Sequence, residues 1–495
     1  MRCFVRMGSS PCSELSITLE HFDPLALFLR SAQAWPERAA LSIDGRQWTY
    51  AELDRWSDAI ATALADAGAH GQRIGIVAEK TASTYAGILG ILKSSGAYIP
   101  LPPDGPPART GNMIRRAAVR FLLGGPSDHE GLTSIQVPAS DAMPQVHHSI
   151  IANDGEAYVL FTSGSTGGPK GVSVSRKNLA HYLRYLLTTY RFNEQDRFTQ
   201  FFAITFDLSV HDLFVCWGAG ACLCVPDRTA HLRAAAFAQE AGITVWFSVP
   251  SLVDLMQRTR SLVPAGLPGI RYAFFCGEAL RWESASAFRS AASSARVVNL
   301  YGPTETTIAI TSFELTGRSG GSEVIVPIGK PFPGHEARII DEELQLAGPQ
   351  LSNGYVEDEQ AQQRAFIKDG TNGTRWYRTG DRVRCDASGD LHYLSRCDDQ
   401  VKVAGHRVEP AEVDQVITPL LGTGRSLTVP ISRQGATRLV TFIDVERSPA
   451  TILECCRLHL PVYMIPERII VIHEWPVTPH GKTDRHALIT LAQNG

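Results

Sequence analysis

The sequence lacks the features that mark membrane, secreted and nucleic-acid-binding proteins. It contains no apolar run long enough to span a bilayer, and the apolar part of its first residues is too short for a signal peptide. The formal net charge is only −3 over 495 residues, which argues against nucleic acid or an anionic membrane as a partner. We therefore expect a cytoplasmic protein that binds neither.

Metal-binding patterns are also missing. The chain has ten cysteines, but neither Cys222 and Cys224 nor Cys455 and Cys456 are accompanied by a second pair or by histidines at ligand spacing. Cys222 and Cys224 lie in an apolar, strand-like stretch and Cys455 and Cys456 in a helical one, so we expect buried free thiols. No His-Glu-x-x-His motif occurs, which excludes the usual zinc-protease site.

What the chain does have is the pattern of an α/β protein. Its length predicts two or more domains. Apolar residues at three- and four-residue steps predict helices over 50–68 and 81–95, and short apolar runs predict strands over 73–78 and 97–101. This alternation is typical of parallel sheets covered by helices.

The alternation continues through five further short apolar or aromatic runs, at 206–214, 221–226, 244–249, 272–276 and 297–301. From residue 325 to 393 the pattern shifts toward strands and turns. A charged stretch near Asp398 indicates a domain boundary, after which a compact C-terminal module would follow.

The most informative motif is a loop rich in glycine and hydroxyl groups. An apolar strand leads into Thr162-Ser-Gly-Ser-Thr-Gly-Gly-Pro-Lys170. Backbone N–H groups, hydroxyls and a lysine in this arrangement can wrap a polyphosphate. It is not a Walker A loop, because Lys170 follows Pro169 and precedes glycine. A flexible surface turn is the alternative for this loop taken alone.

Four more segments carry chemistry-bearing residues: 299–305, 377–381, 396–405 and 481–482. Glu305 follows a Gly-Pro turn at the end of a predicted strand, where α/β sheets place their ligands. Asp381 could accept the two hydroxyls of a ribose. Taken singly, segment 299–305 could be a structural turn, 377–381 a surface turn and 396–405 a charged loop. Lys482 by itself would be read as an exposed surface charge.

Together, however, the segments resemble the adenylate-forming ligases, the superfamily of acyl-CoA synthetases, luciferases and nonribosomal peptide synthetase adenylation domains. They follow the order of that superfamily's core motifs: 162–171, 301–305, 377–381, 396–405 and 481–482. Motifs of the adenylation branch are similar to another four segments: 48–53, 92–100, 206–214 and 460–466. The chain looks most like stand-alone ligases that load D-alanine or L-proline onto carrier proteins.

The resemblance implies an α/β fold with two domains. Residues 1–397 would form a large N-terminal domain of layered α/β sheets with a small barrel-like β part. Residues 398–495 would form a small, mobile α+β lid domain that carries Lys482 and rotates about a hinge at Asp398. The rotation would let two half-reactions share one adenylate.

The resemblance also implies an ATP- and Mg²⁺-dependent reaction that gives an acyl-AMP and pyrophosphate, followed by acyl transfer to a thiol. Joining two anions requires positive charge, and Lys482 would supply it as the catalytic lysine. Glu305 would also be catalytic and would hold the Mg²⁺. The residues that would bind ATP are Thr162, Ser163, Gly164, Ser165, Thr166, Lys170, Gly277, Glu278, Asn299, Tyr301, Gly302, Thr304, Asp381, Tyr393, Arg396 and Lys482.

Asp207 indicates which acid is activated. In amino-acid-activating relatives the aspartate at this place binds the α-ammonium group, so the resemblance implies an α-amino acid; a helix-capping aspartate is the alternative. The other residues expected around the substrate are Leu208, His211, Phe247, Phe274, Cys276, Leu300, Ile308 and Ala309. Their bulk, and the absence of a charged side chain among them, predict a small neutral substrate: alanine first, then proline, serine or glycine.

We therefore expect an amino acid–carrier protein ligase of natural-product (nonribosomal peptide or polyketide, including antibiotic) biosynthesis. Its partner would be a separate phosphopantetheine-bearing carrier protein, because no segment after the last motif offers the modified serine. The enzyme itself would be a monomer or weak dimer. Two alternatives stay open: an acyl- or aryl-CoA synthetase, against which Asp207 argues, and a catalytically inactive nucleotide-binding protein, against which Glu305, Asp381 and Lys482 argue.

Overall fold

The computed structural model describes residues 4–6, 18–125, 131–142, 155–164, 168–227, 229–317, 323–370, 373–433, 436–478 and 483–494. The chain forms two compact units. Unit 1 comprises Met1–Pro103, Arg116–Leu160 and Gly171–Ser395, and unit 2 comprises Asp104–Arg115, Phe161–Lys170 and Arg396–Gly495. The C-terminal segment thus groups with two earlier pieces of chain, while the boundary and hinge expected at Asp398 stay predictions.

The first sheet has seven strands in the order β19-β9-β8-β5-β4-β6-β7. Their bounds are β4 (Arg73–Val77), β5 (Ala97–Leu101), β6 (Phe121–Leu123), β7 (Thr133–Ile135), β8 (Glu156–Thr162), β9 (Lys170–Ser175) and β19 (Gly354–Tyr355). The helices α2 (Tyr50–Asp66) and α3 (Ala82–Lys93) lie beside each other. Thr49 and Glu52 form a capping box that starts α2. The predicted helices and strands between residues 50 and 101 are confirmed.

The second sheet has nine strands in the order β16-β15-β14-β13-β12-β10-β11-β2-β3. Their bounds are β2 (Ala39–Ile43), β3 (Arg46–Thr49), β10 (Arg197–Thr199), β11 (Cys222–Cys224), β12 (Val245–Ser248), β13 (Tyr272–Phe275), β14 (Arg296–Tyr301), β15 (Thr311–Glu314) and β16 (Lys330–Pro331). The neighbours β12, β13 and β14 run parallel, whereas β15 is antiparallel to β14. The run 206–214 does not continue the strands but lies mostly in a helix, α6 (Leu208–Gly218).

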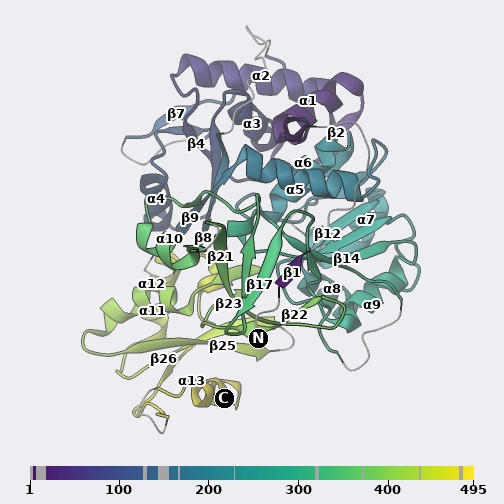
Figure 1. The fold of residues 1–495 in the computed structure, drawn as a ribbon. Coiled ribbons are helices and arrows are strands. Elements are labelled where there is room, and N and C mark those ends of the chain that lie inside the picture. Colours follow the sequence, from purple (N-terminus) through teal and green to yellow (C-terminus); the bar gives the residue numbers. More distant parts are fainter. Residues whose placement is uncertain are drawn as a thin grey trace. The chain divides into compact units, whose positions relative to one another are not determined.

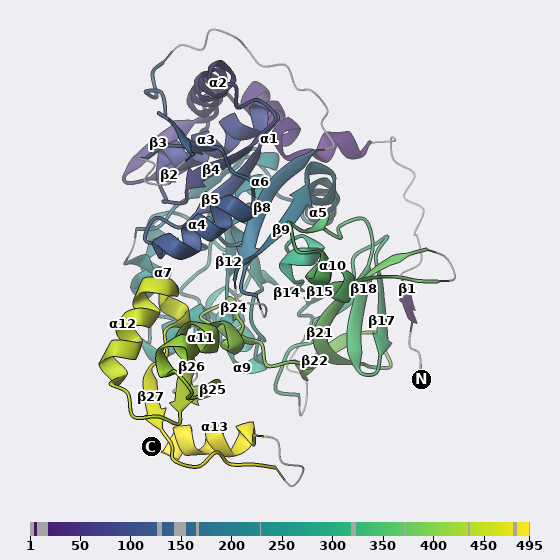
Figure 2. The same ribbon diagram turned by 90° about the vertical axis from the view of Figure 1, so that its left-hand side faces the viewer.

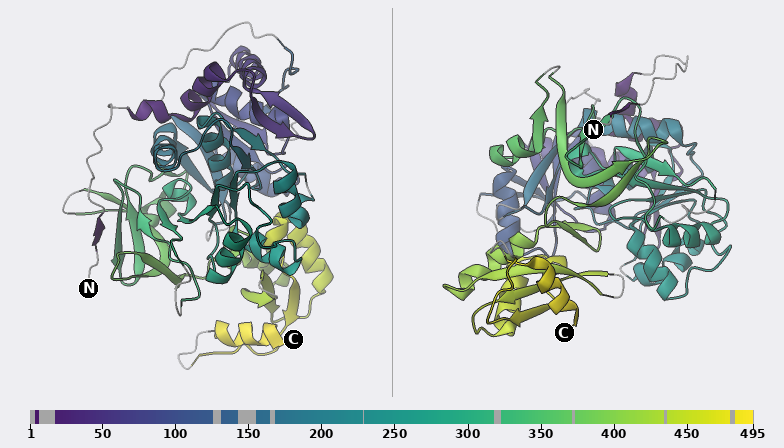
Figure 3. Two further views of the ribbon diagram at one scale, coloured as in Figure 1. Left: turned by 90° about the vertical axis from the view of Figure 1, so that its right-hand side faces the viewer. Right: turned by 60° about the horizontal axis from the view of Figure 1, so that its bottom comes forward.

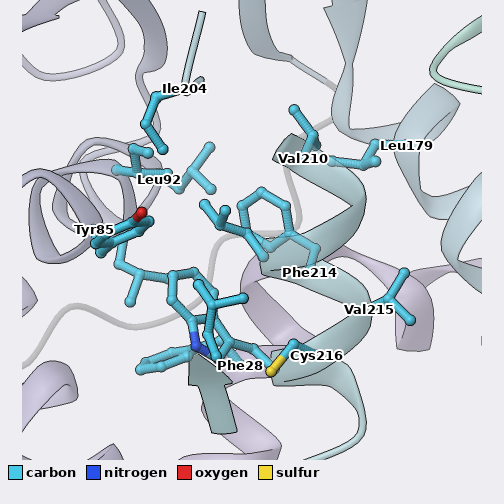
Figure 4. Close-up of a cluster of buried hydrophobic side chains, with 14 of the residues drawn as sticks. Phe28, Tyr85, Leu92, Leu179, Ile204, Val210, Phe214, Val215 and Cys216 are labelled. Carbon is cyan, nitrogen blue, oxygen red and sulfur yellow. The ribbon is translucent and has the colours of Figure 1, made fainter. Parts of the chain in front are cut away.

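The core of unit 1 is built around α6. Residues 208–217 of this helix are all buried, so it is apolar on nearly every side, as expected for a central helix. Figure 4 shows Phe214 of α6 among the side chains of Phe28, Tyr85 and Leu92. The helix α5 (Arg176–Thr189) lies beside α6 (Figure 1). The other helices of unit 1 are α1 (Pro24–Ala34), α7 (Ala234–Glu240), α8 (Pro250–Arg258), α9 (Trp282–Ala291) and α10 (Glu359–Ala365).

The third sheet of unit 1 is antiparallel, as the strand-and-turn pattern over 325–393 predicts. It has the order β1-β17-β18-β21-β20, with β22 paired to β21. Most of its strands are drawn in green in Figure 3. Its strands are β1 (Phe4–Arg6), β17 (Glu336–Ile340), β18 (Glu343–Ala347), β20 (Phe366–Lys368), β21 (Arg375–Cys385) and β22 (Leu391–Arg396). Asp341 and Glu342, both at positive φ, join β17 to β18 in a two-residue turn.

Unit 2 contains a three-stranded sheet of β25 (Ser426–Arg433), β26 (Ala436–Ile443) and β27 (Arg468–Val471), with the hairpin β23 (Val401–Val403) and β24 (His406–Val408) (Figure 2). Its helices are α11 (Pro410–Ile417), α12 (Pro449–His459), α13 (Arg485–Asn494) and most of α4 (Pro107–Arg116). Val408, Val413 and Leu439 belong to a separate apolar core. The expected mixed α/β fold of layered sheets is confirmed.

Two further expectations concern the surface and the thiols. No helix within the described ranges has the length and apolar character that a membrane crossing requires. The cysteines Cys222, Cys224 and Cys456 are buried free thiols, as expected, whereas Cys455 is partly exposed.

Candidate active site

Several of the residues expected around the substrate lie on one face of the nine-stranded sheet. Phe247 of β12 pairs in register with Phe274 of β13, which pairs with Val298 of β14. Because successive side chains of a strand point to opposite faces, Cys276 and Leu300 follow on the same side as Phe274 and Val298. All of these side chains belong to the main core of unit 1. Parallel strands thus bring together residues far apart in the sequence.

Asp207 stands at the start of α6, in the N-cap position, yet its side chain makes no capping hydrogen bond. The helix-capping alternative is therefore wrong, because a capping aspartate accepts from the first-turn N–H groups. The side chain is 4% exposed. His211 lies one turn further along the same helix face.

His211 completes the cluster. Its ring centroid lies 4.3 Å from that of Phe247 and 5.5 Å from that of Phe274. Leu208, Ile308 and Ala309 belong to the same apolar core. The structure thus brings His211, Phe247 and Phe274 into contact and buries the other predicted residues, and their contact with a substrate stays a prediction. We refer to them as the selectivity cluster: Asp207, Leu208, His211, Phe247, Phe274, Cys276, Leu300, Ile308 and Ala309.

Sequence reasoning missed a partner of this cluster. The Tyr182 hydroxyl of α5 lies 2.6 Å from His211 Nδ1, and both residues are buried. Burial lowers the pKa of His211 to about 3, so the ring is neutral at pH 7. Burial, followed by the charges of Cys276 and Asp207, raises the pKa of Tyr182 well above its ordinary value. The sequence of α5 gives no sign of this contact.

The residues expected to bind the nucleoside lie on alternate positions of β14. Asn299 and Tyr301 point to the opposite face from Val298 and Leu300. The Asn299 side-chain amide donates to the Pro327 carbonyl at 2.8 Å. The Tyr301 hydroxyl donates to the Asp381 carboxylate. The fold thus places together an amide, an aromatic ring and the carboxylate expected to meet the ribose.

Tyr393 packs against the same small apolar group as Tyr301. Gly302 lies where chain segments approach closely, because a Cβ there would come within 2.6 Å of Ala309 Cα. Gly277, at φ +88°, turns the chain at the end of β13. The Glu278 carboxylate accepts from the Ser251 N–H at 2.9 Å, so this side chain orders the start of α8.

Glu305 follows Thr304 in a short helical turn and is 1% exposed. The Tyr355 hydroxyl donates to Glu305 Oε1 at 2.6 Å, a contact that sequence reasoning did not find. No group of three or more histidines, cysteines or acidic residues within the described segments could hold a metal ion. A Mg²⁺ ion held through the hard oxygen of Glu305 would therefore take most of its other ligands from phosphates and water, as Mg²⁺ commonly does.

The remaining predicted nucleotide-binding residues belong to unit 2. The Ser163 hydroxyl donates to the Arg407 carbonyl at 2.6 Å, and the Gly164 N–H donates to Glu412 Oε2 at 3.2 Å. Arg396 donates to the Asp398 carboxylate at 2.8 and 2.7 Å. Thr162 ends β8 and Lys170 begins β9. The predicted residues Ser165, Thr166 and Lys482 lie outside the described residues.

Comparison with known proteins first defines the class. A family model described as AMP-binding enzyme matches residues 28–356. The D-alanine–D-alanyl carrier protein ligase of Lacticaseibacillus rhamnosus is 31% identical over 93% of this chain and 97% of its own length. The chain is therefore an adenylate-forming enzyme.

The chain belongs to the AMP-binding enzyme family. Among solved structures it is similar to the Vibrio cholerae adenylation domain AlmE in complex with glycyl-adenosine-5'-phosphate, with a TM-score of 0.85, 28% identity, and coverage of 99% of this chain and all of that one. It is also 32% identical, over 93% of its residues, to one of the plipastatin synthase proteins of Bacillus subtilis (strain 168). The chain spans 19% of the length of that large synthase protein.

Proposed function

We propose that this enzyme activates a small neutral α-amino acid with ATP and passes it to the phosphopantetheine thiol of a carrier protein, in nonribosomal peptide or polyketide biosynthesis. A carboxylate oxygen of the amino acid attacks the α-phosphorus, the bond to the β-phosphate breaks, and pyrophosphate leaves. The thiol then attacks the acyl carbon, and AMP leaves. Asp207 carries the proposal, because a carboxylate that is only 4% exposed, next in sequence to the core residue Leu208, matches a ligand with a positive charge.

The other residues of the site have separate roles in the reaction. Lys482 bridges the substrate carboxylate and the α-phosphate, where negative charge builds up. Asp381, which Tyr301 holds through a hydrogen bond, accepts the ribose hydroxyls. Glu305, oriented by Tyr355, holds Mg²⁺, which neutralises phosphate charge when it is bound. Rotation of residues 398–495 about Asp398 then withdraws Lys482 and opens the way to the thiol.

The preference for a small substrate rests on the selectivity cluster. The rings of His211, Phe247 and Phe274 pack against one another, and we infer from their bulk that a long substrate side chain does not fit. By similarity to ligases that load alanine, alanine ranks first, before proline, serine and glycine. Two relatives support a small substrate: one is named a D-alanine ligase, and the solved structure of the other contains a glycyl adenylate. The carrier protein as acceptor is supported by the first of them.

Amino-acid-dependent ATP–pyrophosphate exchange tests the proposal. The purified enzyme is assayed with each proteinogenic amino acid, both enantiomers of alanine, a fatty acid and an aryl acid. Exchange with one or a few small amino acids is the expected result. Exchange with only the fatty or aryl acid would favour a CoA synthetase, and exchange with no acid would favour an inactive nucleotide-binding protein.

A further inference from the structure

The hydrogen bond between Tyr182 and His211 fixes the chemistry of the His211 ring. The hydroxyl oxygen lies 2.6 Å from Nδ1, a short distance for such a bond. Tyr182 comes from α5 and His211 from α6, two helices that pack side by side. The opposite ring nitrogen, Nε2, is buried and has no hydrogen-bond partner among the described residues.

Counting donors and acceptors selects one tautomer of the neutral ring. If Nδ1 accepts the Tyr182 O–H, both of these atoms are satisfied and the proton of the ring sits on Nε2. If Nδ1 carries the proton instead, the buried Tyr182 O–H has no acceptor among the described residues, and Nε2 also lacks a donor. The first arrangement leaves one buried group unpaired and the second leaves two. The ring therefore presents an N–H donor at Nε2.

This donor lies within the selectivity cluster. The rings of Phe247 and Phe274 flank His211, and Asp207 precedes it by one helical turn. A buried donor without an acceptor is costly, so such a group in a binding cluster marks where a ligand atom accepts. Because His211 stays neutral at pH 7, it matches an uncharged oxygen rather than a carboxylate.

We propose that His211, oriented by Tyr182, donates a hydrogen bond from Nε2 to a side-chain oxygen of the substrate, and that the enzyme selects serine or threonine over alanine. The inference rests on the proposed amino-acid activation and refines its substrate class. It reverses the order of alanine and serine that similarity to alanine-loading ligases suggests. Tyr182 is the positioning residue, since it sets the tautomer of His211 and does not itself need to touch the substrate.

The test compares the enzyme's kcat/KM for serine, threonine, alanine and glycine in pyrophosphate exchange. A site built around a buried donor rejects the analogue that lacks the acceptor, so we expect serine or threonine to exceed alanine on the order of 100-fold. Exchange with alanine at least as fast as with both hydroxyl-bearing acids would overturn this inference and leave amino-acid activation standing. Exchange with no amino acid would overturn the proposed function and this inference together.

Tyr182→Phe tests the positioning role. The variant loses the bond that holds the tautomer, and we expect the serine-to-alanine ratio, or the threonine-to-alanine ratio, to fall about 10-fold. The ratio is measured within one enzyme sample, so a smaller folded fraction does not change it. Tyr185→Phe is the matched control on the same helix, because its hydroxyl lies 2.8 Å from a different partner, Ser312 Oγ. An unchanged ratio in Tyr182→Phe, or an equal fall in both variants, would contradict the proposed role of Tyr182.

Discussion

Replacing Asp207 by asparagine distinguishes two possible roles of this residue: binding the substrate's ammonium group and stabilising the fold. Asparagine keeps the size of the side chain and suits the N-cap position of α6. Leaving a buried ammonium group without its carboxylate costs about 3–5 kcal/mol. We therefore expect kcat/KM for the amino acid to fall roughly 150- to 5000-fold. The free energy of unfolding should change by less than about 1 kcal/mol, because asparagine has the same shape and its amide oxygen still accepts hydrogen bonds.

Pyrophosphate exchange and urea denaturation measure the two effects, and Asp196→Asn is the matched control. Asp196 is equally buried, but it holds the Arg271 guanidinium and the Thr244 hydroxyl at 2.6 Å each. We expect this control to lose about 2–3 kcal/mol of stability and to keep its amino-acid preference. Unchanged exchange in Asp207→Asn would refute the assigned role. A stability loss in Asp207→Asn as large as in the control would show that Asp207 supports the fold instead.

Three further predictions test other parts of the site. Tyr355→Phe removes a hydrogen bond to the Glu305 carboxylate that is worth about 1.5–3 kcal/mol. Exchange at limiting MgATP should therefore fall roughly 10- to 100-fold. An unchanged rate would contradict the orienting role of Tyr355. Lys482→Ala should abolish exchange with an unchanged melting temperature; retained exchange would exclude it as the catalytic lysine. Acid should destabilise the fold through His211. Its pKa is about 3 when folded and near 6.5 when unfolded, so the unfolded state alone takes up this proton as the pH falls below 6.5. Between pH 7 and pH 5 this uptake lowers the free energy of unfolding by about 2 kcal/mol. In His211→Gln, the fall measured by urea denaturation over the same pH range should be smaller by that amount. Equal losses in both proteins would contradict the assigned pKa.

Local patterns predicted the elements best where their periodicity was clear. The helix at α2 has apolar residues at three- and four-residue steps and a capping box, and its start at Tyr50 was predicted correctly. The run 206–214 was harder, because a helix buried on every side loses the periodicity that distinguishes it from a strand. The alternation of β14 also explains why Asn299 and Leu300, adjacent in sequence, were assigned to different parts of the site.

The contacts that sequence reasoning missed are long-range. Tyr182 and His211 are 29 positions apart, and Tyr355 and Glu305 are 50 apart. Each tyrosine lies in an element that needs no ligand to explain it, so only the packing of α5 on α6, or of β19 near the Glu305 turn, reveals its partner. The grouping of Phe161–Lys170 with the C-terminal segment is equally invisible from the sequence, because it depends on tertiary contacts.

Direct detection of the adenylate tests amino-acid activation most closely. The enzyme is incubated with MgATP and an equimolar mixture of amino acids, a fatty acid and an aryl acid, and the enzyme-bound products are analysed by mass spectrometry. We predict an aminoacyl-AMP of a small neutral amino acid, which disappears in Lys482→Ala. An adenylate of the fatty or aryl acid alone, or no adenylate with any acid, would contradict amino-acid activation.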